Sequence, residues 1–374
     1  MLSDDKILYK LAFSSLKGLT PEIASKVIEH TGSAQAFFET PKPRLLRSMP
    51  QMAKMLEQNN FADLLESAEK VINFNNTHSI RTLFPDSNNG YPEKLTNCDD
   101  APLRLFCLGT PPTPDAPTIS IVGTRNSTNY GATFINSLMQ QIAEALPKAV
   151  IVSGLAFGID ILAHRAALKN GLGTVAVLAH GLDTLYPATH RKDAAEIIKS
   201  GGALLTEYAP GVKIHKGFFL ARNRIVAGMA DVTIVVESAL RGGAMVTARL
   251  ASDYNRIVMA VPGRATDPYS EGCNDLVASN RGEMLRNVDD LLRATGWQSN
   301  VEGNQKELFS TPSKLLTPVQ QRVVEFLRKN GDSHIDAIAH GVELKVHEAA
   351  SILIDMDFDG LVATLPGSCY SLLI

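Results

Sequence analysis

Short runs of β-branched and aliphatic residues recur through the middle of the chain, where glycine-rich turns and stretches with helical spacing separate them. Each run holds about five residues without alternating polar positions, which is typical of parallel strands buried on both faces. Strands that alternate with helices in this way predict an α/β fold with a doubly wound parallel sheet. The predicted strands are Thr118–Val122, Val150–Val152, Thr174–Leu178, Ala203–Leu205, Val232–Val236 and Ile257–Val261.

The first part of the chain, residues 1–80, has apolar residues at helical spacing, beginning with Leu8 and Leu11. We expect an N-terminal helical domain of the SAM or helix-hairpin-helix type. Thr20 is suited to cap a helix that has Pro21 at its first position. A helix pair of this kind is compatible with phosphate binding, but a pair that serves only packing is the simpler interpretation.

The last part of the chain contains a polar stretch and then a small domain. Residues 296–316 lack periodicity and predict a linker between a sheet domain at 81–295 and a C-terminal domain at 317–374. The C-terminal order of three helices and a hairpin predicts a winged helix-turn-helix. Its third helix, Val346–Phe358, has three acidic residues and no Lys or Arg, whereas a DNA-reading helix presents basic side chains. We therefore expect this domain to bind protein, either its own chain or a partner, and not to read DNA.

Charge and composition narrow the possible partners. The formal net charge is −3 at pH 7, so a nucleic-acid site must be a local cluster of cations. Residues 118–292 are the only part with more Lys and Arg (17) than Asp and Glu (15). The chain shows no apolar stretch of about 20 residues, no signal-peptide pattern and no CxxC pair. We expect a cytoplasmic protein with no membrane partner, no metal and no cofactor.

The loop after the first predicted strand contains the first candidate for chemistry. It runs from Gly123 to Ser127 and precedes a helix, an arrangement that presents amide groups and a helix dipole to an anion in a Rossmann-like sheet. Arg125 stands where a dinucleotide fingerprint needs its second glycine, and it suits an exposed phosphate better than a pyrophosphate pressed against the backbone. The alternative is a capped turn in which Arg125 pairs with a carboxylate.

Three further segments follow later strands. Residues 153–160 carry two glycines that allow close approach of a ligand, and Asp160 shares a helix face with His164. These two residues could form an acid–base pair, but a structural histidine is the simpler interpretation. Residues 213–224 hold four Lys and Arg, no acid and two phenylalanines, which suits phosphate contact and base stacking. A solvated basic loop with the phenylalanines in the core is the alternative.

The fourth segment, residues 241–248, again places glycines before a helix. Each such turn alone is a weak signal. Together they are stronger, because the carboxyl ends of parallel strands meet at one edge of a sheet. The pattern therefore predicts a phosphate-lined trough at that edge.

Taken together, these segments resemble the DprA/Smf family of DNA-processing proteins of natural transformation. The resemblance rests on IVGTRNSTNYG, SGLAFGIDILAHRAAL, FFLARNRIVAGM and GGAMVTARLA, with AVPG, SEGCNDL, YPEKL and APLRLFCLG, over about residues 80–290. It implies an extended Rossmann-like fold that binds single-stranded DNA, usually as a homodimer, protects incoming DNA and helps to load the RecA recombinase. It implies no enzymatic activity.

The segments and the resemblance together give a set of expected DNA-binding residues. Arg125 would contact phosphate, and the glycines of the loops would shape and close the pocket. The full set is Gly123, Arg125, Ser127, Ser153, Gly154, Gly158, Asp160, Lys216, Phe219, Arg222, Asn223, Arg224, Gly242, Gly243 and Thr247.

The sequence departs from the family pattern at three places. Phe157 stands where the family often has arginine, and Leu220 stands where proline is common. Arg241 replaces a small residue before the glycine turn, which would restore the missing positive charge.

A competing hypothesis is a Rossmann-like hydrolase of nucleoside phosphates. Asp160 or Glu237 would supply its carboxylate. The sequence has no Walker A lysine, no paired metal-ligand motif and no nucleophile elbow. An NAD-dependent oxidoreductase is disfavoured by Arg125 and because no acidic residue closes the second strand, as the dinucleotide fingerprint requires about 20 residues after its glycines.

Overall fold

The computed structural model describes residues 4–87, 89–299, 316–359, 361–365 and 368–373. The chain forms two compact units, residues 1–300 and 301–374, and each is described by itself. Most of the predicted linker, residues 300–315, lies outside the described residues.

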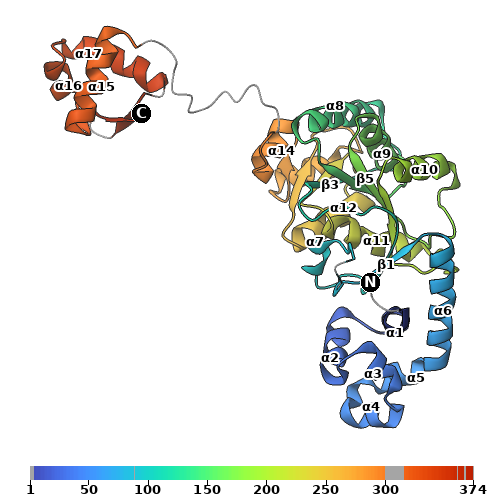
Figure 1. The fold of residues 1–374 in the computed structure, drawn as a ribbon. Helices are drawn as coiled ribbons and strands as arrows, with labels where there is room; N and C mark the ends of the chain where they lie inside the picture. The colour runs from blue at the N-terminus through green and yellow to red at the C-terminus, as the bar shows by residue number, and fades with distance from the viewer. Residues whose placement is uncertain (1–3, 88, 300–315, 360, 366–367, 374) are drawn as a thin grey trace. The chain divides into compact units, whose positions relative to one another are not determined.

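A nine-stranded sheet forms the centre of the first unit, in the order β1-β2-β6-β5-β4-β3-β7-β8-β9 (Figure 1). The seven strands β3 to β9 are all parallel to one another. β2 pairs antiparallel with β6, and β1 pairs antiparallel with β2 at the edge of the sheet. The strand bounds are β1 Arg81–Leu83, β2 Leu105–Gly109, β3 Thr118–Gly123, β4 Val150–Ser153, β5 Gly173–Val177, β6 Ala203–Thr206, β7 Val232–Val236, β8 Ile257–Ala260 and β9 Glu283–Met284.

The six predicted strands are confirmed, with bounds that agree within one residue. The prediction missed three strands at the sheet edges. β1 and β9 have only three and two residues, only Leu83 of β1 is buried, and both residues of β9 are exposed, so neither forms an apolar run. The doubly wound topology is present as a mostly parallel sheet. The strand order reverses at β3, which has β4 on one side and β7 on the other.

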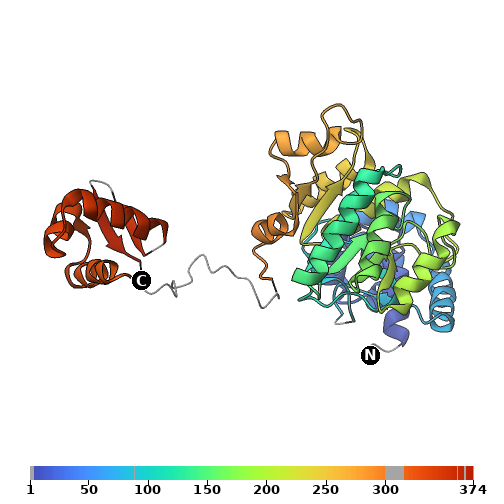
Figure 2. The same ribbon diagram turned by 90° about the horizontal axis from the view of Figure 1, so that it is seen from above.

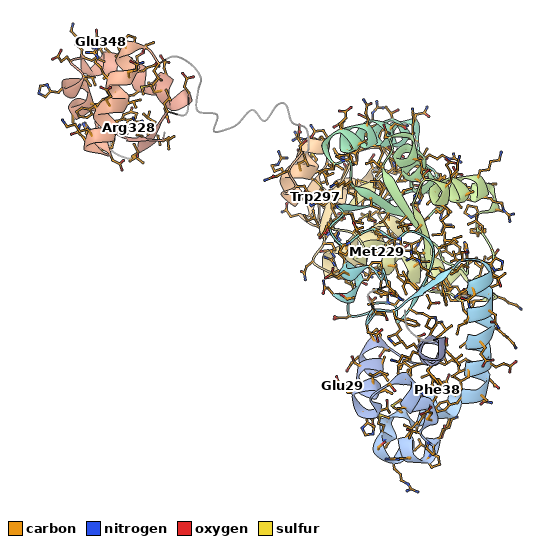
Figure 3. All side chains as sticks on the ribbon, in the orientation of Figure 1. Glu29, Phe38, Met229, Trp297, Arg328 and Glu348 are labelled. Carbon is orange, nitrogen blue, oxygen red and sulfur yellow. The ribbon has the colours of Figure 1, made fainter. Side chains whose placement is uncertain are left out.

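Helices cover both faces of the sheet (Figure 2). Alternate strand residues point to opposite layers, so Ile121 packs with α8 and α9, whereas Val122 packs with α11 and α12. Met229, just after α11, is buried in the interior of the second layer (Figure 3). The helix bounds are α7 Glu93–Thr96, α8 Asn129–Ala145, α9 Ile159–Lys169, η2 Ala188–His190, α10 Arg191–Lys199, α11 Lys216–Gly228, α12 Gly243–Asp253, α13 Glu271–Ala278 and α14 Val288–Thr295.

Residues 4–77 form helices around their own apolar cluster. Phe13, Phe37 and Leu45 are buried there, and Phe38 packs against them (Figure 3). The predicted cap is confirmed, since the Ile23 amide donates to Thr20 Oγ1 at 3.3 Å. The helices are α1 Asp4–Ser14, α2 Pro21–Thr31, α3 Ala34–Glu39, α4 Lys42–Ser48, η1 Pro50–Met52, α5 Ala53–Gln58 and α6 Phe61–Thr77.

The second unit contains the three predicted helices and the predicted hairpin. A two-residue strand, β10, completes an antiparallel sheet of order β10-β12-β11. A capping box of Thr317 and Gln320 begins its first helix. The elements are α15 Pro318–Asn330, β10 Ser333–His334, α16 Ile335–Gly341, α17 Val346–Phe358, β11 Val362–Leu365 and β12 Cys369–Leu372.

His164 on α9 is a buried packing residue. Its Nδ1 lies 2.7 Å from Thr174 Oγ1. The Thr174 hydroxyl donates to the carbonyl of Ile151, so it accepts from the imidazole N–H. Burial, together with the positive charge of Arg222, lowers the pKa of His164 to about 3. These contacts support the structural interpretation of this histidine.

The shifted pKa of His164 predicts a pH dependence of stability. The unfolded chain binds a proton at this histidine below its ordinary pKa of 6.5, whereas the folded chain does not until about pH 3. The free energy of unfolding therefore falls as the pH falls between these values. His164→Gln should flatten that fall in urea unfolding measured from pH 7 to 4. His30→Asn changes an exposed side chain and serves as the control. An unchanged profile in His164→Gln would contradict the assignment.

Candidate functional site

A pocket of ≈ 370 Å³ lies at the carboxyl edge of the sheet. Its walls are the loops after β3, β4 and β7 and one face of α11, which meet there because the strand order reverses at β3. Ten of the expected residues line the pocket: Gly123, Arg125, Gly154, Asp160, Phe219, Arg222, Asn223, Gly242, Gly243 and Thr247. The sequence did not point to Tyr269, which also lines the pocket and comes late in the loop between β8 and α13.

Arg222 is the buried cation of this pocket. Only 5% of the residue is exposed, and its Nη1 donates to the carbonyl of Val177 at 2.5 Å. Its Nε is buried without a hydrogen-bond partner among the described residues. Gly154 makes room for the guanidinium, because a Cβ there would lie 1.8 Å from Arg222 Nη1. A buried guanidinium with an unused donor attracts an anion strongly.

Asp160 fastens the loop after β4 instead of facing an open site. Its Oδ2 accepts from the amides of Gly154 and Ala156 at 3.2 and 3.4 Å. Burial raises the pKa of the Asp160 carboxyl, and the charge of Arg222 opposes that rise. The carboxylate thereby holds the backbone of Gly154 beside Arg222.

Ser153 and Gly158 support the pocket from outside its lining. The Ser153 hydroxyl is buried and donates to the carbonyl of Ile121 at 2.6 Å, which links β4 to β3. Gly158 has a φ of 73°, and a Cβ there would lie 2.2 Å from the carbonyl oxygen of Thr124. The loops after β3 and β4 therefore touch only because this residue is glycine.

Arg125 and Phe219 line the pocket together, and other aromatic rings lie in the loops around them. The exposed Arg125 guanidinium lies 5.6 Å from the centre of the Phe219 ring, and it forms no ion pair with any residue that the structure describes. The ring of Tyr186 meets Phe219 edge-on at 5.6 Å. Phe157 is 44% exposed and lies edge-on to His190. No pattern in the sequence indicates that Tyr186 lies beside Phe219.

The structure places Arg224, one of the expected DNA-binding residues, away from the pocket. A residue two positions after Arg222 on a helix points to a different face. Arg224 Nη1 donates to the carbonyl of Asp100 at 2.6 Å, and Nη2 pairs with Glu207. This arginine therefore lies away from the pocket, and the expectation that it meets Arg125 and Arg222 at one rim is wrong.

Two other expected residues also lie outside the pocket lining. Ser127 is half-buried in the loop between β3 and α8, and Lys216 is exposed at the first position of α11.

The start of α12 faces the pocket without a side-chain cap. Its N-cap is Gly242, where a Cβ would lie 2.5 Å from Ser238 Oγ. At Gly243 a Cβ would meet no atom within 4 Å, so open space lies against the first turn. Unpaired amides and the positive end of the helix dipole attract anions. The uncapped helix start and Arg222 therefore line the same pocket.

Within the described ranges, no helix combines the length and apolar character required to span a bilayer. The same residues contain no cluster of three His, Cys, Asp or Glu side chains that could hold a metal ion.

The structure defines an α/β protein with a mostly parallel central sheet and a pocket at the carboxyl edge of that sheet. Residues 82–296 match the family described as DNA recombination-mediator protein A, and the chain belongs to this family.

Curated relatives and solved structures agree with this assignment. The DNA processing protein DprA of Streptococcus pneumoniae is 40% identical over 54% of this chain and 70% of its own length. A putative DNA processing protein DprA of Mycobacterium tuberculosis is 37% identical over 72% of this chain and 69% of its own.

Among solved structures, the X-ray structure of DprA from Streptococcus pneumoniae matches 78% of this chain and 99% of its own, with a TM-score of 0.61 and 29% identity. A structure of DNA processing protein A from Helicobacter pylori, solved to explain its single-stranded DNA binding mode, matches 57% of this chain and 94% of its own. Its TM-score is 0.50 at 33% identity.

Replacing either of two pocket glycines by alanine should affect the stability of the fold differently. Gly154→Ala should displace Arg222 from Val177 and lower the free energy of unfolding by about 1–3 kcal/mol. Gly243→Ala should leave it within about 0.5 kcal/mol, because the new methyl group meets empty space. Urea unfolding of the two variants measures both effects. Equal stability of Gly154→Ala and the unmodified chain would contradict the placement of Arg222.

Proposed function

We propose that this protein binds single-stranded DNA at the pocket on the carboxyl edge of its sheet. One DNA phosphate binds between the uncapped start of α12 and the buried guanidinium of Arg222, and a neighbouring phosphate contacts Arg125. The observation that carries this proposal is the unpartnered Nε of Arg222 in a pocket that an uncapped helix start also lines. The Helicobacter pylori relative, described as binding single-stranded DNA, supports it.

The aromatic rings around the pocket favour a single strand over a duplex. Phe219 and Phe157 present ring surfaces that unpaired bases can stack on, and each stacked base contributes roughly 1–3 kcal/mol. Phe157 stands where the family often has arginine, so stacking takes the place of a phosphate contact there. Stacking is tolerant of sequence, so we expect little base preference.

Hydrolysis of nucleoside phosphates is the less favoured function. Asp160 is buried and accepts from two loop amides. Glu237 is 2% exposed and accepts from Thr128. A catalytic carboxylate must reach a water molecule or a substrate, and both candidates are already engaged by the backbone. Incubation with nucleotides, followed by assay for released base, tests this alternative separately from a gel shift.

Family membership supports a wider role for the whole chain. The family is described as a recombination mediator, which supports protection of incoming single-stranded DNA, loading of RecA and assembly as a homodimer. We also propose that the N-terminal helices at residues 1–80 form a SAM or helix-hairpin-helix domain.

We propose that the C-terminal unit is a winged-helix domain that binds protein. The order of α15, α16 and α17 before the β11–β12 hairpin supports the winged-helix class. Its third helix, α17, exposes the apolar side chains of Val346 and Ile354 beside acidic residues, which suits a protein surface better than phosphate.

Two arginines should separate DNA contact from structural support. Arg125→Ala should weaken binding to a single-stranded oligonucleotide about tenfold and lower the slope of log K against log salt by about 1. Arg224→Ala should lower the melting temperature through loss of Glu207 and leave affinity nearly unchanged. Fluorescence anisotropy at several salt concentrations provides the measurement. The opposite pattern, with affinity lost only in Arg224→Ala, would refute the assigned site.

The acidic C-terminal unit predicts a second result. Deleting residues 313–374 should change single-strand affinity less than about twofold, because like charge keeps α17 from DNA phosphates. The same anisotropy titration compares the truncated and full chains. A loss of tenfold or more would show that the C-terminal unit takes part in DNA binding.

A further inference from the structure

The helix after β3, α8, begins at the position where dinucleotide-binding Rossmann folds hold a pyrophosphate. In this protein a side chain fills that position. Glu237 Oε2 accepts from the amide of Thr128 at 2.9 Å, and Oε1 accepts from the Thr128 hydroxyl. A Cβ on Gly131 would lie 2.3 Å from Glu237 Oε2, so the carboxylate lies directly against the first turn of α8.

Glu237 reaches this place from the end of β7, the strand beside β3. Its backbone has a φ of 53°, and its carbonyl accepts from the amide of Thr124 at 2.6 Å. A positive φ in a non-glycine residue and the burial of a carboxylate each cost stability. The Thr128 contacts and the α8 dipole offset these costs, as a bound phosphate would in a nucleotide-binding relative of the fold.

The other helices that begin at this edge can be compared with α8. In the loop before α9, the Asp160 carboxylate accepts from two amides in a similar way. The start of α12 has neither a carboxylate nor any other side-chain cap among the described residues. Of the helices that follow β3, β4 and β7, two thus have an internal carboxylate at or just before their start, and α12 is left for an external anion.

We infer that Glu237 is a built-in anion that replaces a nucleotide phosphate at α8. It excludes free nucleotides and dinucleotides from the usual Rossmann position. The consequence that a DNA phosphate is directed to α12 rests on the proposed function, whereas the replacement itself does not.

Chemical rescue of Glu237→Gly tests the replacement. Glycine accepts the positive φ, and removal of the side chain opens the space against α8. Inorganic phosphate should then bind there, and at about ten times its Kd it should raise the melting temperature of the variant about 3 °C more than that of the unmodified chain. Sodium chloride at equal ionic strength should not, and pyrophosphate should act like phosphate.

A matched control separates this effect from general stabilisation by phosphate, which acts on any folded protein. Asn255→Gly removes a similar positive φ, 56°, without removing a carboxylate. Its response to phosphate should equal that of the unmodified chain. Equal responses of Glu237→Gly and Asn255→Gly would overturn the inference.

A second variant keeps the test decisive if Glu237→Gly does not fold. Glu237→Gln keeps the side-chain volume and removes the charge, so its melting temperature should fall at low salt. The deficit should persist in about 1 M salt, because Glu237 is buried and salt screens a buried charge much less than an exposed one. A melting temperature equal to that of the unmodified chain would contradict the inference.

Failure of the inference and failure of the proposed function give different results. Wild-type affinity for a single-stranded oligonucleotide, measured in parallel, concerns α12 and Arg222 and does not depend on phosphate rescue. Rescue without DNA binding would leave Glu237 as the internal anion and reject the DNA site. DNA binding without rescue would support the DNA site and reject Glu237 as a replacement for a nucleotide phosphate.

Discussion

The free backbone amides at the carboxyl edge of the sheet require negatively charged or carbonyl partners, and this requirement organises the rest of the site. The loops after β3, β4 and β7 meet because the strand order reverses at β3. Asp160 and Glu237 satisfy two of these loops from within the protein. The start of α12 has no such partner and lines the same pocket as Arg222. Under the proposed function, an external phosphate binds at the start of α12 because the loops after β3 and β4 already have an internal carboxylate.

A chain with a net charge of −3 can present such a site because its cations are placed locally. Gly154 has no side chain, so Arg222 can be buried beside the loop, and its Nε keeps an unused donor. Arg125 stays exposed at the pocket, where it lies over Phe219. A buried arginine, an exposed arginine and aromatic rings together suit a single nucleic-acid strand, which presents both phosphates and unpaired bases.

The sequence predicted the sheet well and the site only in part. Apolar runs identify buried strands, so the parallel core and ten pocket residues followed from pattern and resemblance. The prediction for Arg224 rested on its closeness to Arg222 in the sequence. Both residues lie on one helix, and side chains two positions apart on a helix point to different faces. The contact of Glu237 with α8 depends on a positive φ and on long-range packing, which no local pattern encodes. An acid directly after a buried strand was the available signal.

The most direct test of the account is the affinity of Gly243→Ala for a single-stranded oligonucleotide, compared with that of the unmodified chain. A methyl group at this position occupies space that is empty without DNA and that a phosphate needs at the start of α12. The account predicts at least about tenfold weaker binding by a variant that remains fully folded. Unchanged affinity in that folded variant would contradict the claim that α12 and Arg222 hold a DNA phosphate.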